Sequence, residues 1–125
     1  SIRLHRQMCI VARCQHVREK YPQASLWLHF HNTRGVAMAN IMAAMEAGMT
    51  QFDGSFGGLG GCPFVPGAAG NISTEDTVWT LNAMRYHTGI SLSKRLAAAK
   101  SQAKVIAGNY RGHHINIEAE TPCKA

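Results

Sequence analysis

Apolar residues recur at helical spacing in four stretches of the chain, residues 2–20, 35–47, 73–87 and 93–108. In the second stretch the apolar residues form one face: Met38, Ile41, Met42 and Met45. We expect this face to pack on a sheet rather than to form a flexible binding surface. Ser73 and Ser93 are suited to cap the last two helices, and Gly48 to end the second. The pattern therefore predicts four helices, each with one buried face.

Two shorter stretches have the character of strands. Residues 26–31, LWLHFH, are apolar and bounded by polar residues, which predicts a buried strand. Alternation along a strand places Trp27, His29 and His31 on one face and the other three side chains on the opposite face. Residues 49–54 predict a second strand, whereas residues 109–125 show little periodicity and are expected to form a loosely ordered tail.

The order strand, helix, strand, loop, helix is typical of βα units on a parallel sheet. In such α/β folds the functional side chains collect at the carboxyl ends of the strands. We therefore expect His29, His31 and the loop that follows the second strand to belong to one site.

That loop, residues 52–71, holds seven of the twelve glycines of the chain together with Cys62. Glycine density of this kind is typical of a hinged active-site loop, although the pattern matches neither a dinucleotide fingerprint nor a Walker A motif. Cys62 has no basic neighbour in sequence, so two interpretations stay open: a thiol that transfers a proton, or an incidental loop residue.

Two histidines at positions i and i+2 of a strand can share one metal ion, but they can equally be polar residues satisfied within a sheet. Asn71 ends the glycine-rich loop, and two interpretations of it stay open: its amide oxygen binds the same ion, or it is a plain turn residue. His29, His31 and Asn71 are all neutral, whereas Mg²⁺ and Mn²⁺ normally recruit a carboxylate, for which Asp53 is one source. His113 and His114 are expected to form an exposed pair in the tail, where a metal site is not favoured.

Composition narrows the functional classes. The 125 residues are 46% hydrophobic, which suits a single domain spanning residues 1–125, and no apolar run is long enough to span a membrane. A formal charge of +6 favours phosphate-bearing partners such as a nucleotide or coenzyme A, while the scattered basic residues do not favour nucleic acid. Four cysteines without a CxxC pair and the lack of a signal peptide suggest a reducing, cytoplasmic location.

Four motifs together are similar to one enzyme family: HFHNTRG at 29–35, FDGSFGGLGGCPF at 52–64, GAAGN at 67–71 and STED at 73–76. The chain resembles the 3-hydroxy-3-methylglutaryl-CoA lyase family and its bacterial relatives, most strongly over residues 25–96. The resemblance implies a (β/α)₈ barrel with a divalent-metal site at the carboxyl ends of its strands. Such a barrel needs about 250 residues, so the chain is expected to be the C-terminal part of a TIM barrel, incomplete by itself.

The resemblance also implies roles for particular residues. His29, His31 and Asn71 would bind Mg²⁺ or Mn²⁺, Cys62 would be the catalytic cysteine, and His29 would also take part in proton transfer. Glu75 would support the residues of the metal site without binding the metal itself. The family's arginine and aspartate of the first strand have no counterpart here.

The implied reaction is cleavage of 3-hydroxy-3-methylglutaryl-CoA to acetyl-CoA and acetoacetate, with the full-length protein a homodimer, located in the mitochondrial matrix if the source is eukaryotic. Two alternatives stay open. One is a related acyl-CoA lyase or Claisen-type condensing enzyme, and the other is an inactive fragment that binds metal or self-associates.

Overall fold

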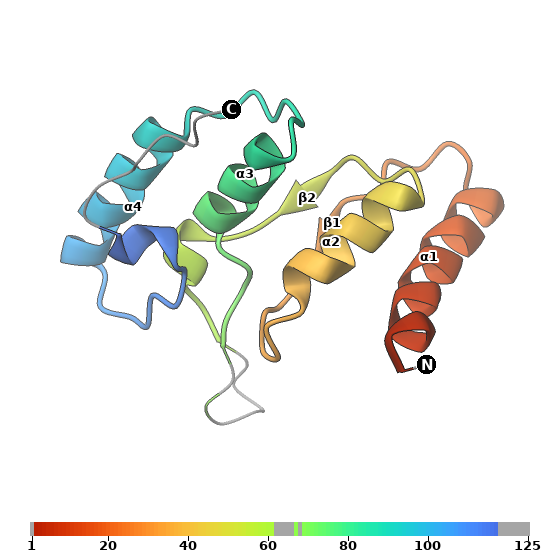
Figure 1. Ribbon diagram of the computed structural model, residues 1–125, viewed down its shortest axis with the longest axis horizontal. Coiled ribbons are helices and arrows are strands. Elements are labelled where there is room, and N and C mark those ends of the chain that lie inside the picture. The colour runs from red at the N-terminus through yellow and green to blue at the C-terminus, as the bar shows by residue number, and fades with distance from the viewer. Residues whose placement is uncertain (1, 62–66, 68, 118–125) are drawn as a thin grey trace.

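Helices alternate with short parallel strands in the computed structural model, which describes residues 2–61, 67 and 69–117 (Figure 1). The elements follow the chain in this order: α1 (Ile2–Lys20), β1 (Leu28–His29), α2 (Ala37–Glu46), β2 (Phe52–Asp53), the 3-10 turn η1 (Phe56–Gly58), α3 (Thr74–Ala83), α4 (Leu92–Val105) and the 3-10 turn η2 (His114–Asn116). Among these described residues, no helix has both the length and the apolar character that crossing a lipid bilayer requires.

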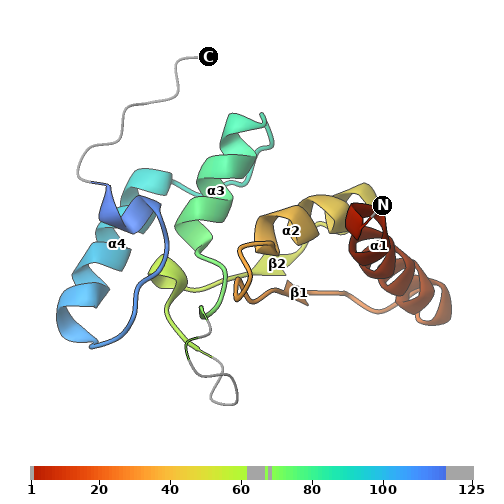
Figure 2. The ribbon, with the colours of Figure 1, turned by 60° about the horizontal axis from the view of Figure 1, so that its bottom comes forward.

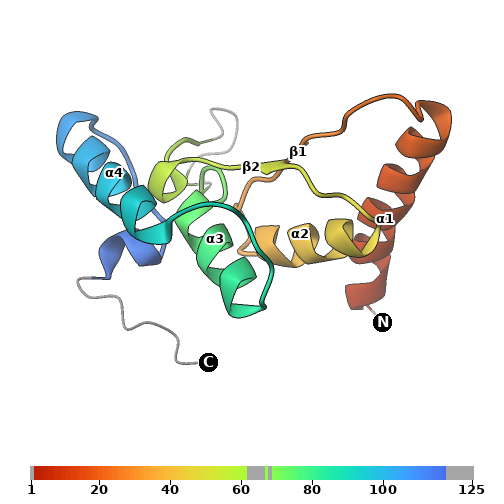
Figure 3. The ribbon, with the colours of Figure 1, turned by 90° about the horizontal axis from the view of Figure 1, so that it is seen from above.

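The two strands pair in parallel, with Leu28 opposite Phe52 and His29 opposite Asp53. Isolated bridges extend the pairing beyond the strands, between His31 and Asn71 and between Ser55 and Ser73. Figure 3 shows α2 and α3 on the same side of the two strands. The predicted α/β fold with a parallel sheet is therefore confirmed, and the arrangement is consistent with part of a (β/α)₈ barrel.

One face of the first strand is covered and the other is open. The prediction of a buried strand is wrong for this second face, where Trp27 is 66% exposed and both histidines are exposed. Alternation itself is confirmed, because Leu28 and Phe30 point the other way and pack against the buried residues of α2. The described part of the chain has helices on one side of the sheet only, which leaves the histidine face accessible.

The core lies between the helices and the covered face of the sheet. α1 packs on α2, where Cys14 is buried beside Ala44, Ala47 and Met49. Burial raises the pKa of the Cys14 thiol, because desolvation disfavours the thiolate. Arg18 of α1 binds the end of α2, because its Nη1 donates to the carbonyl oxygens of Ala47 and Gly48 at 3.3 and 3.4 Å.

The predicted helix boundaries hold at some ends and fail at others. α1 and the Gly48 cap are as expected, and Ser73 caps α3 by accepting a hydrogen bond from the Asp76 N–H at 3.2 Å. α3 ends at Ala83, four residues before the predicted end, because Arg85 adopts a left-handed conformation with φ of 65°. α4 begins after Ser91, so Ser93 lies inside the helix and is not its cap.

Residues 109–117 are more regular than their sequence predicts. They contain η2, and Ile115 within it is buried. Figure 2 shows η2 beside α4, on the α3 side of the molecule. A segment without apolar periodicity can still be ordered when it packs on elements that precede it.

Candidate functional site

The open face of the sheet carries the two histidines of the HxH motif. His29 and His31 lie on this face with ring centroids 5.1 Å apart and planes at 69°. His29 is the last residue of β1 and His31 follows it by two positions, so alternation along the chain puts both on one face. The structure therefore brings together the pair that the sequence singled out.

Asp53 contacts His29 because β1 and β2 place these two residues in register. The Oδ1 atom of Asp53 lies 2.7 Å from Nδ1 of His29. An ionised carboxylate only accepts hydrogen bonds, so in the neutral imidazole this contact places the proton on Nδ1 and the lone pair on Nε2. The arrangement is the one in which a carboxylate orients a metal-binding histidine.

Asn71 joins the same edge of the sheet through its bridge with His31. Its side-chain Nδ2 donates to the carbonyl oxygen of Leu59 at 3.1 Å, which orients the amide and leaves its oxygen as the acceptor. Within the described residues, no group of three His, Cys, Asp or Glu side chains is arranged to hold a metal. Two imidazoles and one amide oxygen still suit a divalent cation by their chemistry, as an incomplete set of nitrogen and oxygen donors.

The glycine-rich loop contains η1 and is hydrogen-bonded to its surroundings at several atoms. Ser55 Oγ donates to Leu59 O at 2.7 Å, and the N–H of Gly57 donates to Oε2 of Glu75 at 2.7 Å. Cys62, the candidate catalytic thiol, lies outside the described residues.

Glu75 is a completely buried carboxylate at the start of α3. Besides the Gly57 N–H it accepts from Ser73 Oγ at 2.9 Å and from Nε of Arg95 at 3.0 Å. The Arg95 guanidinium in turn stacks on the ring of Phe56, with its carbon 3.7 Å from the ring centroid. The sequence suggested a supporting role for Glu75 but did not indicate Arg95, because no local motif relates residues twenty positions apart.

Asp76 receives hydrogen bonds from two histidines that the sequence predicted to be an exposed pair. Its carboxylate accepts from the backbone N–H of His113 and of His114 at 2.8 and 2.9 Å, and their Nδ1 atoms lie at 3.1 and 2.8 Å. Only the His113 side chain is mostly exposed, at 81%, whereas that of His114 is 15% exposed. Burial by itself would raise the pKa of Asp76, but these hydrogen bonds outweigh it and lower the pKa below its ordinary value.

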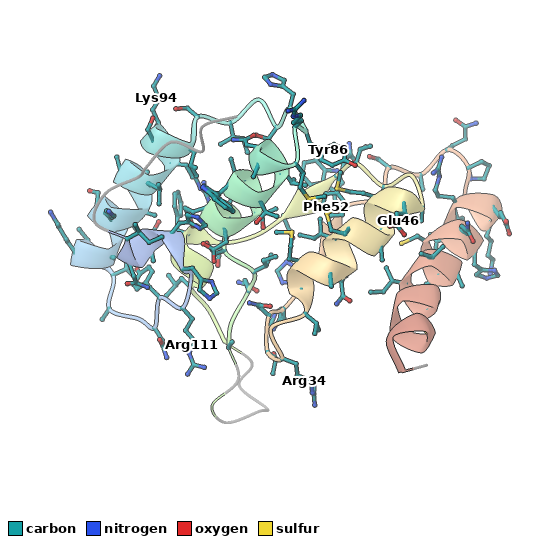
Figure 4. The ribbon with its side chains drawn as sticks, viewed as in Figure 1. Arg34, Glu46, Phe52, Tyr86, Lys94 and Arg111 are labelled. Carbon is teal, nitrogen blue, oxygen red and sulfur yellow. The ribbon has the colours of Figure 1, made fainter. Side chains whose placement is uncertain are left out.

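A groove of about 340 Å³ lies between α2 and α3, on the helix side of β2. Its walls are largely apolar and include Phe52, Val78, Leu81 and Tyr86. Figure 4 labels Phe52 and Tyr86 in this region. The groove lacks the two histidines and Asn71, so we place the candidate site on the open face of the sheet.

The sequence profile of the HMGL-like family matches residues 5–101, more than three quarters of the chain. The chain belongs to the HMGL-like family. Its similarity to curated proteins includes 52% identity over 81 residues to hydroxymethylglutaryl-CoA lyase YngG of Bacillus subtilis, covering 65% of this chain and 27% of that protein. It is also 43% identical over 90 residues to (R)-citramalyl-CoA lyase of Chloroflexus aurantiacus, covering 72% of this chain and 28% of that protein.

Solved structures of HMGL-like proteins show the same arrangement of the backbone. An HMG-CoA lyase from Acinetobacter baumannii, in complex with coenzyme A and 3-methylmalate, superimposes with a TM-score of 0.81 and 34% identity, covering 95% of this chain and 39% of that one. The chain thus spans about a quarter of the length of these curated HMGL-like relatives and under two fifths of the solved structure.

Proposed function

We propose that this chain contributes a metal-binding and catalytic edge to a divalent-metal-dependent lyase that cleaves 3-hydroxy-3-methylglutaryl-CoA to acetyl-CoA and acetoacetate. The observation that carries the proposal is the His29–Asp53 pair, at 2.7 Å, beside His31 and the bridge to Asn71. HMGL-like membership and the similarity to hydroxymethylglutaryl-CoA lyases support the reaction class. Residues 1–125 would then be a partial TIM-barrel lyase domain, in a cytoplasmic or matrix protein that forms a homodimer at full length.

His29, His31 and Asn71 would hold Mg²⁺ or Mn²⁺. When bound, such a cation acts as a Lewis acid that eases ionisation of the substrate hydroxyl and stabilises enolate charge. Asp53 occupies Nδ1 of His29, so Nε2 would be the nitrogen that binds the cation. Leu59 fixes the amide of Asn71 in the corresponding way, by accepting from its Nδ2.

The reaction needs two proton transfers, from the C3 hydroxyl of the substrate and to the acetyl-CoA carbanion. His29 and Cys62 are our candidates for these steps, without an assignment of which residue performs which. Because Asp53 holds its Nδ1 proton, His29 has one free nitrogen, Nε2, which can bind the cation or exchange a proton but cannot do both at once. The glycine-rich loop would exclude water from the acyl group while the bond breaks.

Coenzyme A would bring phosphate groups to the end of the molecule where the glycine-rich loop lies. Figure 4 shows Arg34 and Arg111 extending from the end of the molecule where the glycine-rich loop lies. Arg111 also donates from Nη1 to the carbonyl oxygen of Gly67 at 3.2 Å, which ties it to that loop. These cations would attract the coenzyme A phosphates at long range.

A second substrate is favoured by one comparison. The similarity to (R)-citramalyl-CoA lyase covers a larger share of this chain than that to YngG, so a related 3-hydroxyacyl-CoA is our alternative substrate. The two substrates share the carbon–carbon bond cleavage that yields acetyl-CoA, and only a direct comparison of turnover separates them.

The test measures Mn²⁺ binding by calorimetry in this chain and three variants, and product release from both thioesters in the protein at full length. We expect Asp53→Asn to weaken Mn²⁺ binding about 10- to 100-fold, as loss of a carboxylate behind a metal-binding histidine does. His31→Ala should abolish binding, whereas Glu46→Gln, an exposed acid on α2, should leave it unchanged. Mn²⁺ binding that His31→Ala does not weaken would contradict the metal site. Binding without cleavage of either thioester by the protein at full length would contradict the reaction.

A further inference from the structure

The C-terminal segment Tyr110–Ile115 lies across the start of the glycine-rich loop. The N–H of Gly112 donates to the carbonyl oxygen of Gly57 at 2.7 Å, which joins segments 55 residues apart in sequence. We call this segment the C-terminal clasp. It is the part of the chain for which the sequence predicted no ordered element.

The packing between the clasp and the loop leaves no space at two glycines. A Cβ atom on Gly57 would lie 2.7 Å from Cδ1 of Ile115 and 2.9 Å from the ring of Tyr110, and Gly57 also has a positive φ of 54°. A Cβ atom on Gly112 would lie 2.7 Å from Oγ of Ser73. Real Cβ atoms are not found this close to other heavy atoms, so side chains of the clasp pack directly on the backbone of Gly57, and Ser73 packs directly on that of Gly112.

The clasp is fastened to α3 by the carboxylate of Asp76. This carboxylate accepts the two backbone and two imidazole contacts of His113 and His114, all between 2.8 and 3.1 Å. The ring of Trp79, one turn further along α3, packs on the ring of His114 with centroids 4.8 Å apart. Charged hydrogen bonds are the stronger kind, so this attachment fixes where Gly112 lies.

Gly57 is consequently held on both sides of its peptide. Glu75 accepts from its N–H and Gly112 donates to its carbonyl oxygen, each at 2.7 Å. The turn that follows carries Leu59, whose N–H donates to Phe56 O and whose carbonyl oxygen accepts from Nδ2 of Asn71. Hydrogen bonds and the short backbone segments between them therefore connect Asp76, through the clasp and Gly57, to the amide of Asn71.

We propose that the C-terminal clasp, fastened by His113 and His114 on Asp76, is a positioning device that sets the start of the glycine-rich loop and, through Leu59, the amide of Asn71. Neither histidine nor Asp76 touches the metal-binding edge in this arrangement, so they act through the loop. The effect on Asn71 as a metal ligand rests on the function proposed above. The effect on the loop does not, since it follows from the contacts alone.

The first test measures amide hydrogen exchange of residues 55–61 by mass spectrometry in Asp76→Asn and in the control Glu46→Gln. We expect exchange of the Gly57, Gly58 and Leu59 amides to rise at least about tenfold in Asp76→Asn, with α1 and α2 unchanged. Release of the clasp removes the packing and the Gly112 hydrogen bond that hold this turn closed, so the amide bonds to Glu75, Ser55 and Phe56 open more often. Unchanged exchange in residues 55–61 of folded Asp76→Asn would overturn the proposal. An equal rise in every helix would also overturn it, because Asp76 would then stabilise only the fold as a whole.

A pair of variants at His114 tests the contact between the clasp and Asp76 while leaving the Asp76 carboxylate in place. Asparagine carries an N–H donor near the place of the histidine Nδ1, so His114→Asn should keep the protection of residues 57–59, and His114→Ala should lose it. Equal exchange in the two variants would count against the imidazole contact.

Mn²⁺ affinity provides the second readout. We expect it to fall several-fold in Asp76→Asn and in His114→Ala but not in His114→Asn. If wild-type protein binds no Mn²⁺, the proposed function fails while the exchange experiment still decides the clasp. If Mn²⁺ affinity is the same in all variants although exchange rises, the link from the loop to Asn71 is wrong.

Discussion

Asp76 illustrates how one carboxylate can serve several parts of the molecule. Its backbone N–H donates to the Ser73 cap of α3, and its side chain accepts from His113 and His114. Burial raises its pKa less than these hydrogen bonds lower it, so the folded state holds Asp76 ionised more strongly than the unfolded chain does.

The lowered pKa of Asp76 makes the free energy of unfolding depend on pH. A carboxyl group with a depressed folded-state pKa stabilises the protein above its ordinary pKa of 3.8, and that contribution disappears as pH falls through the folded-state pKa. We expect wild type to exceed Asp76→Asn in free energy of unfolding by about 1–3 kcal/mol at pH 5, and the difference to shrink toward pH 3. Urea unfolding at several pH values measures it, and a difference that grows on acidification would contradict the assignment.

At the scale of single elements, α3 organises the site through its first turn. Ser73 both caps the helix by accepting from Asp76 N–H and donates to Glu75, the buried carboxylate that holds Gly57. Adjacent residues at one helix terminus therefore connect the glycine-rich loop, the C-terminal clasp and, through Arg95, the following helix α4. The position of the loop depends on how well this terminus is formed.

Removing the Ser73 hydroxyl tests that dependence. Ser73→Ala loses a helix cap, which costs about 1 kcal/mol, and leaves buried Glu75 without one hydrogen bond, which adds about 1–2 kcal/mol. We therefore expect the free energy of unfolding to fall by about 2–3 kcal/mol, measured in urea. The matched variant Ser101→Ala, at an exposed position of α4, should change it by no more than about 0.5 kcal/mol. Equal effects of the two variants would show that the Ser73 cap contributes little.

At the scale of the whole molecule, the sheet is covered on one face only. In the described part of the chain β1 and β2 pair only with each other, and Trp27 stands 66% exposed on the open face beside the two histidines. An open sheet edge and an exposed aromatic side chain both favour association with other protein surfaces.

We therefore expect this chain, studied by itself, to self-associate in a concentration-dependent way. Trp27→Ser should reduce that association, measured by sedimentation velocity, because it removes the largest exposed apolar side chain of the open face. Trp79→Ser is the matched tryptophan control, since that ring packs on His114 and lies 36% exposed on α3. A chain that stays monomeric at high concentration would contradict the expectation.

Local patterns in the sequence determined the elements of the fold and the identity of the candidate ligands. Helical periodicity located the four α-helices of the described residues, and alternation placed His29 and His31 on one face, because side-chain direction follows from the backbone repeat. The glycine-rich loop and Asn71 were located by composition and motif. The roles of His29, His31, Asn71 and Cys62 remain predictions from the resemblance.

Tertiary packing alone decided how distant residues meet. Asp53 contacts His29 only because two strands pair in one register, and Arg95 reaches Glu75 only because α4 packs beside α3. The C-terminal clasp has no apolar repeat, so its order comes from hydrogen bonds to Asp76 and Gly57 that no local pattern encodes. Periodicity reports which face a residue takes within its own element, whereas contacts between elements depend on how complete elements pack in space.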